Sequence, residues 1–203
     1  MSVFKRICTG LMISTLSLTA YAAQPGETQN PDQVPAETEV NVSDTREVIQ
    51  VLYVSNTSEI KVADLVRERN PGEALQSYAD ELIRDHETLI SALKELANVK
   101  SISLKEGELE EPAQLVGTMM DQQLQTLAAK SQEEFRSAFL ETSIMNHQKT
   151  LEFFSQIEQG NSDDALKAII AVARQAVEKH LADAQKLKAE VQQPGSEPAQ
   201  PAE

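Results

Sequence analysis

Hydrophobic residues recur at alternating steps of three and four along most of the chain between residues 44 and 191. This spacing is typical of helices that bury one face in a left-handed bundle. It predicts four long helices, over about 44–69, 71–99, 131–159 and 162–191, and a weaker amphipathic helix over 113–129. Gly and Pro fall almost entirely at the joints. We therefore predict an all-α, four-helix bundle with a long crossover that carries an extra helical segment.

Helix starts are marked by short polar motifs. Segments 44–47 (Asp-x-x-Glu) and 131–134 (Ser-x-x-Glu) have the pattern of a capping box, in which two side chains bind backbone N–H groups reciprocally. At the first joint we expect Asn70 to cap the second helix, with Pro71 in its first turn and Glu73 closing the box.

Each long helix carries one ionisable residue on its apolar face. These residues are Glu59, His86, His147 and His180, and they include all three histidines of the chain. Glu59 and His86 lie on either side of the first joint, and His147 and His180 lie on either side of the last one. Within each pair, the distances of the two residues from their joint differ by five residues, about 7 Å along a helix. All four therefore fall near mid-bundle, where their side chains can share one site.

Three imidazoles and a carboxylate suit the ligand shell of one transition-metal ion, namely zinc, copper or iron. Asp85 points about 100° away from His86 on a helix and is a flanking residue rather than a ligand. Asp183 follows His180 by three residues and could orient its ring. The alternative is a metal-free polar layer in which Glu59 accepts a hydrogen bond from an imidazole.

The first residues have the three-part pattern of a secretory signal peptide. Two basic residues precede an apolar run over 7–18, and small residues follow. The run is too short and too rich in Ser and Thr for a membrane span, and no later stretch qualifies. We expect a signal peptide over 1–23, cleaved near Ala22 or Ala23, and export to the periplasm.

Composition shifts mark the remaining boundaries. Residues 24–43 and 192–203 are polar and Pro-rich without apolar periodicity, so we expect a disordered linker and a disordered tail around a bundle over 44–191. The net charge of -14 disfavours nucleic acid and would attract a cation or a basic envelope protein, although solubility alone is the more favoured explanation of this charge. The single cysteine, Cys8, lies inside the predicted signal peptide.

Several of these residues together resemble a known family. The signal peptide, Ser58-Glu59, Asp85-His86, His147 and the ending His180-Leu181-x-x-Ala184 are similar to the bacterial domain of unknown function 4142 family, over about 44–191. The resemblance implies a periplasmic, ferritin-like four-helix bundle and little about activity.

Catalytic motifs are missing from the sequence. It has no Gly-x-Ser-x-Gly elbow and no glycine-rich phosphate loop, and Ile83 and Val177 stand where Glu-x-x-His motifs of di-iron enzymes would need Glu. We predict a periplasmic protein that binds or buffers a metal at mid-bundle. The alternative is a structural or stress-related envelope interaction module with a metal-free polar layer. A weak redox enzyme is a third, less favoured hypothesis.

Overall fold

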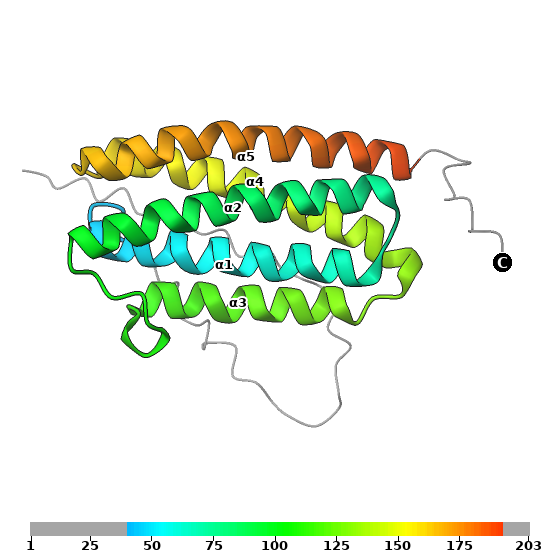
Figure 1. The fold of residues 1–203 in the computed structure, drawn as a ribbon, viewed down its shortest axis with the longest axis horizontal. Helices are drawn as coiled ribbons and strands as arrows, with labels where there is room; N and C mark the ends of the chain where they lie inside the picture. Colours follow the sequence, from blue (N-terminus) through cyan, green and yellow to red (C-terminus); the bar gives the residue numbers. More distant parts are fainter. Residues whose placement is uncertain (1–39, 193–203) are drawn as a thin grey trace, which may run out of the picture. The chain divides into compact units, whose positions relative to one another are not determined.

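The computed structural model describes residues 40–192, and the predicted signal peptide and tail lie outside this part of the chain. Residues 40–192 contain five α-helices, one short 3-10 helix and no strand, which confirms the all-α prediction. The elements are α1 Thr45–Arg69, α2 Glu73–Val99, η1 Glu106–Glu108, α3 Glu111–Ala128, α4 Gln132–Gly160 and α5 Asp164–Val191 (Figure 1).

The helices pack as two hairpins joined by a long crossover. α1 packs on α2, α4 packs on α5, and the hairpins meet where α2 contacts α5. The crossover from α2 to α4 runs through η1 and α3, and α3 lies along α1 on the side away from α2 (Figure 1). This is the predicted bundle with its extra helical segment. Among the described helices, none is both long and apolar enough to cross a membrane.

The apolar core is divided into two clusters along the bundle. The first holds these fully buried residues near the start of α1 and the α4–α5 joint: Val48, Ile49, Leu52, Leu93, Phe154, Ile157, Leu166 and Ile170. The second holds these residues near the α1–α2 joint: Val62, Val66, Leu75, Leu82, Phe135, Phe139, Leu140 and Ala184. On every long helix, the predicted ionisable residue falls between the two sets.

Two helix starts follow their capping motifs, with one difference. The Ser131 hydroxyl accepts from the Glu134 N–H, and the Glu134 carboxylate accepts from the Ser131 N–H, so α4 has the predicted box. Asp44 caps α1, but the Glu47 carboxylate accepts from the Asn41 N–H (2.9 Å) rather than from the Asp44 N–H. The chain before α1 turns back far enough to take over that bond.

The joint between α1 and α2 corrects the role predicted for Asn70. Asn70 has left-handed backbone angles (φ 46°, ψ 61°) and donates its N–H to the Val66 carbonyl, so it ends α1 instead of starting α2. Asn tolerates this conformation well, which suits it to the end of a helix. The N-cap of α2 is Gly72, whose φ of 117° disfavours other residues, and α2 begins at Glu73.

One fully buried glutamine anchors the crossover to α1. The Gln50 amide donates to the Ser103 carbonyl (2.8 Å), and its oxygen accepts from the Glu110 N–H (2.7 Å). These bonds satisfy backbone groups of the connection between α2 and α3, which has little regular structure of its own.

We expect the Gln50→Leu variant to lower the free energy of unfolding by about 1–2 kcal/mol, because it leaves the Ser103 carbonyl and the Glu110 N–H without their partner at a partly buried position. Urea denaturation followed by circular dichroism would measure the loss. Gln148→Leu, at an exposed position of α4, is the control and should change little. Equal stability of the Gln50 variant and the control would contradict the anchoring role.

Candidate metal centre

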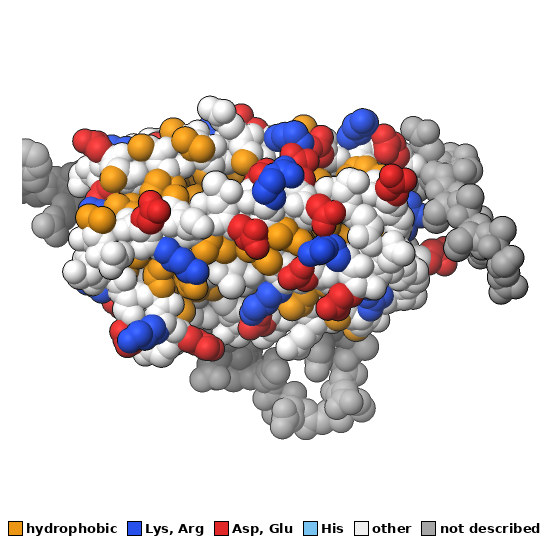
Figure 2. Space-filling view, viewed as in Figure 1, with side chains coloured by type: hydrophobic (Ala, Val, Ile, Leu, Met, Phe, Trp, Pro, Cys, Tyr) orange, Lys and Arg blue, Asp and Glu red, His pale blue; other side chains and the backbone are white. Residues whose placement is uncertain are grey.

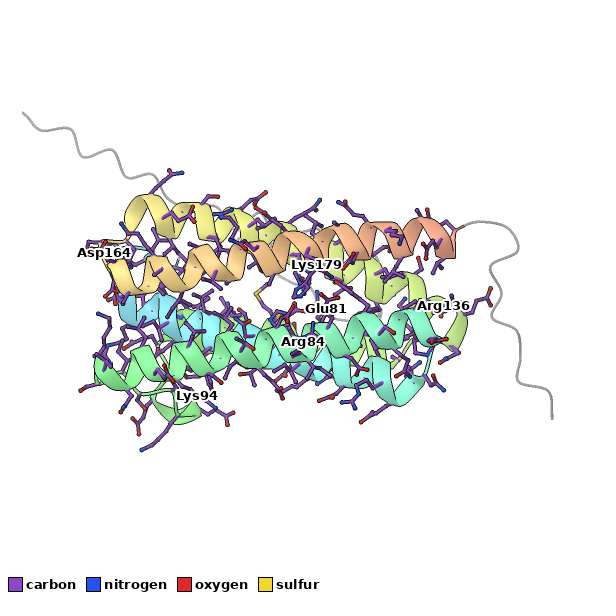
Figure 3. All side chains as sticks on the ribbon, turned by 45° about the horizontal axis from the view of Figure 1, so that its top comes forward. Glu81, Arg84, Lys94, Arg136, Asp164 and Lys179 are labelled. Atoms are coloured by element: carbon purple, nitrogen blue, oxygen red, sulfur yellow. The ribbon has the colours of Figure 1, made fainter. Side chains whose placement is uncertain are left out.

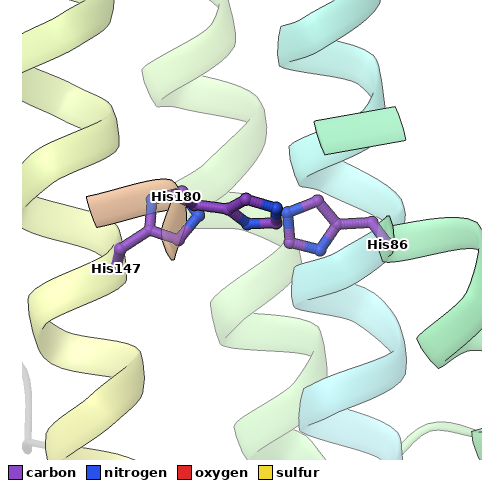
Figure 4. Close-up of side chains that lie close together, drawn as sticks. All are labelled: His86, His147 and His180. Carbon is purple, nitrogen blue, oxygen red and sulfur yellow. The ribbon is translucent and has the colours of Figure 1, made fainter. Parts of the chain in front are cut away.

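Three histidines meet in the gap between the two apolar clusters. His86 comes from α2, His147 from α4 and His180 from α5, and their exposed fractions are 6%, 2% and 1%. The ring centroids lie 5.3, 5.6 and 6.1 Å apart, which makes a nearly regular triangle. One ring nitrogen of each lies within 4.8 Å of the other two (Figure 4). The face shown in Figure 2 displays none of them.

On each ring, one nitrogen is bound to an oxygen of the protein. The pairs are His86 Nδ1 with Asn56 Oδ1 (2.6 Å), His147 Nδ1 with the Ser143 carbonyl (2.7 Å), and His180 Nε2 with Asp85 Oδ2 (2.9 Å). Amide, carbonyl and carboxylate oxygens accept hydrogen bonds and do not donate them. Each of these ring nitrogens must therefore carry the proton, which fixes the tautomer of each neutral ring.

The opposite nitrogen of each ring is left with a lone pair and no partner among the described residues. His86 Nε2, His147 Nε2 and His180 Nδ1 are all fully buried and make no hydrogen bond. Buried polar atoms are normally paired, so three unpaired atoms in one place need a common explanation. Imidazoles that bind a metal show this arrangement, in which the outer N–H donates to an oxygen and the inner nitrogen faces the ion.

The surroundings of His86 and His180 favour the neutral form that binds metal. Burial lowers the pKa of His86 well below its ordinary value, and the neighbouring His147 and His180 lower it further. Burial also lowers the pKa of His180, against the raising effect of its hydrogen bond to Asp85. A neutral imidazole has its lone pair free at pH 7 without losing a proton.

The donor set fits a transition-metal ion. Three imidazole nitrogens suit zinc and copper, and with three protein ligands a fourth coordination position stays open. Bonds of about 2.0–2.1 Å in a tetrahedral arrangement would place the nitrogens about 3.4 Å apart. The observed nitrogens lie within 4.8 Å of one another, so small side-chain movements would bring them to that spacing.

Glu59, the fourth predicted ligand, is buried on α1 but has a different partner. Its carboxylate accepts from the Asn146 amide (2.8 Å), which also donates to Gln123 Oε1 (3.0 Å). Glu59 is not in the group whose ligand atoms lie within 4.8 Å. The structure thus brings three of the four predicted residues together and ties the fourth to Asn146, the residue before His147.

The two flanking acids differ in their contacts. Asp85 lies on the side of α2 that faces α5, so it binds His180 rather than the adjacent His86. Asp183 pairs with Lys179 (2.7 Å). We expected Asp183 to orient the ring of His180, but Asp85 makes that hydrogen bond instead.

Two hydrogen-bond partners of the histidines were not predicted. Asn56 lies on α1, three residues before Glu59, and Ser143 lies four residues before His147, one turn away. The phenol of Tyr78 lies behind them, 2.7 Å from the Ser143 hydroxyl, and it donates to the His180 carbonyl. Burial raises the pKa of Tyr78, so it remains a donor. Ser143, one turn before His147, was an available signal, whereas Asn56 lies on a different helix from His86 and gave none.

Comparison with known proteins identifies the family. A family model described as Domain of unknown function (DUF4142) matches residues 29–187, most of the chain, and the chain belongs to this family. No curated protein and no solved structure matches it.

The lowered pKa values predict a pH dependence of stability for the metal-free protein. Unfolded histidines bind protons near pH 6.5, whereas His86 and His180 resist protonation in the fold, so their contribution is present above pH 6.5 and lost below it. We expect the free energy of unfolding to fall by on the order of 1–2 kcal/mol between pH 6.5 and 5.5. Urea denaturation with a chelator present would measure it. A His86→Leu variant should show a smaller slope, and an equal slope would contradict this origin.

Proposed function

We propose that this protein binds one transition-metal ion through His86, His147 and His180 and acts as a metal-binding or metal-buffering protein of the periplasm. The observation that carries the proposal is the convergence of three buried, unpaired imidazole nitrogens. Their outer hydrogen bonds already select the tautomers that binding requires, so the site is organised before an ion arrives.

Each residue of the site has a separate task in this proposal. The three histidines supply the ligand nitrogens, and the oxygens of Asn56 and Ser143 hold two of the rings in place. Asp85 holds the third ring and supplies a negative charge near the ion, which increases the basicity of the imidazole. Zinc and copper suit three imidazoles best, and iron is the third candidate.

The arrangement favours holding an ion over converting a substrate. All three histidines are almost completely buried, and the outer nitrogen of each is occupied by an oriented acceptor. The described groove lined by Tyr53, Val54, Leu104, Gly117 and Asp121 lies between α1 and α3, and none of the histidines lines it. A substrate in that groove would not contact the ion.

The compartment rests on the signal-peptide pattern of residues 1–23, which lie outside the described part of the chain. Cell fractionation followed by N-terminal sequencing would test it. A first residue of Ala23 or Gln24 in the periplasmic fraction would support export.

Metal content measured by mass spectrometry would test the centre itself. The protein is purified without a polyhistidine tag and incubated with zinc, copper or iron, and excess metal is removed. We expect about one equivalent in the unmodified chain. His147→Ala removes one of three ligands, and we expect it to lose at least tenfold in affinity while circular dichroism shows the same helix content.

Glu59→Gln is the matched control for the ligand set. Because Glu59 is tied to Asn146, the control should retain one equivalent, and a loss of binding would show that this carboxylate moves to the ion. No metal under any loading would overturn the proposal. The histidines would then form a polar layer that sets helix register, and the protein would be an envelope interaction module. In that case replacement of all three by Leu should leave the bundle stable or stabilise it.

A further inference from the structure

Of the three outer partners of the histidines, only one reaches solvent. Asn56 and Ser143 are 6% and 2% exposed, whereas the Asp85 side chain is 25% exposed. That exposed partner is also the only carboxylate of the three. The triangle of histidines is therefore connected to the surface through an anionic group on the α2–α5 face.

A second carboxylate lies next to this partner. Glu81 precedes Asp85 by one helical turn, and one ligand atom each from Glu81, Asp85 and His180 lie within 4.8 Å of one another. His180 is 1% exposed, and its other nitrogen, Nδ1, is the unpaired atom that belongs to the inner triangle. One imidazole ring thus has one edge at the surface carboxylates and the other edge at the candidate centre.

Two exposed cations neutralise these carboxylates. Lys179 lies 2.5 Å from Glu81 and 2.7 Å from Asp183, and Arg84 lies 3.2 Å from Asp85 and 3.8 Å from Glu81. Figure 3 shows Lys179 on α5 and Glu81 on α2 facing each other at mid-length, with Arg84 nearby. Ion pairs between exposed side chains are weak and are screened by salt, so a divalent cation can replace them.

We propose that Glu81 and Asp85 form a loading port through which a divalent cation reaches the three-histidine centre, with Lys179 and Arg84 as displaceable covers. The inference rests on the proposed function. The arriving ion displaces the two side-chain cations from the carboxylates. Because the His180 ring lies between these carboxylates and the inner nitrogens, the ion enters past this ring, which turns aside during entry. After entry the His180 Nε2–H is again donated to Asp85, so the transfer requires no proton loss from that ring.

Stopped-flow mixing of the full chain with Zn²⁺, followed by a chromophoric zinc chelator, would test the port. We expect Glu81→Gln to slow zinc uptake about tenfold, because it removes half of the attracting charge. Zinc release to excess chelator should slow by a similar factor, since a port serves both directions, and one equivalent should still be bound. Lys179→Met should accelerate uptake.

The ion pair between Lys188 of α5 and Glu141 of α4 lies away from the port and offers matched controls. Its substitutions change the net charge of the protein by the same amount as those at Glu81 and Lys179. Glu141→Gln and Lys188→Met should leave the rates within about twofold of the unmodified chain, as expected for distant, screened charges. Equal rates for Glu81→Gln and Glu141→Gln, in variants with unchanged circular dichroism, would overturn the port alone. If Glu81→Gln no longer bound one equivalent of zinc, Glu81 would be a ligand of the ion, and this too would overturn the port. No zinc uptake by the unmodified chain would overturn the proposed function and the port together.

Discussion

The central constraint on this bundle is that polar groups placed between two apolar clusters must all find partners. A buried polar atom without a partner costs more than most single apolar contacts contribute. At mid-height the chain meets this constraint on the outer side of every histidine, with an amide, a backbone carbonyl and a carboxylate. On the inner side it does not, and three buried ring nitrogens make no hydrogen bond within the described part of the chain. A cation bound by these nitrogens would give all three a partner at once. This is the physical basis for proposing a metal centre instead of a metal-free polar layer.

The general architecture follows from patterns that are local in sequence. Apolar spacing and joint residues are enough to place the five helices within a few residues, because burial of one face determines both the period and the ends. The height of each ionisable residue follows as well, since the rise per residue of a helix is constant. The prediction that His86, His147 and His180 share one level needs nothing more, and the structure does bring them together.

Side-chain direction and local competition between hydrogen bonds could not be obtained in this way. Glu59 lies at the right height, but its carboxylate is bound by Asn146, a neighbour contributed by another helix. Asn70 has the composition of a helix start and yet ends a helix, because its left-handed backbone and Gly72 together make the turn. Asp85 binds the histidine of the facing helix instead of the one beside it in sequence. Each case depends on a contact between elements, which a pattern along one helix does not contain.

The two-hairpin architecture also sets when the centre comes into existence. His86 belongs to the first hairpin, whereas His147 and His180 belong to the second, and the crossover with α3 separates them along the chain. A nascent or unfolded chain therefore holds no three-ligand site, and the site is complete only after the hairpins dock. Under the proposed export and metal binding, the ion acquired would be decided by the metal pool at the place of folding. The position of the ligands in the chain would then contribute to metal selection alongside their affinity.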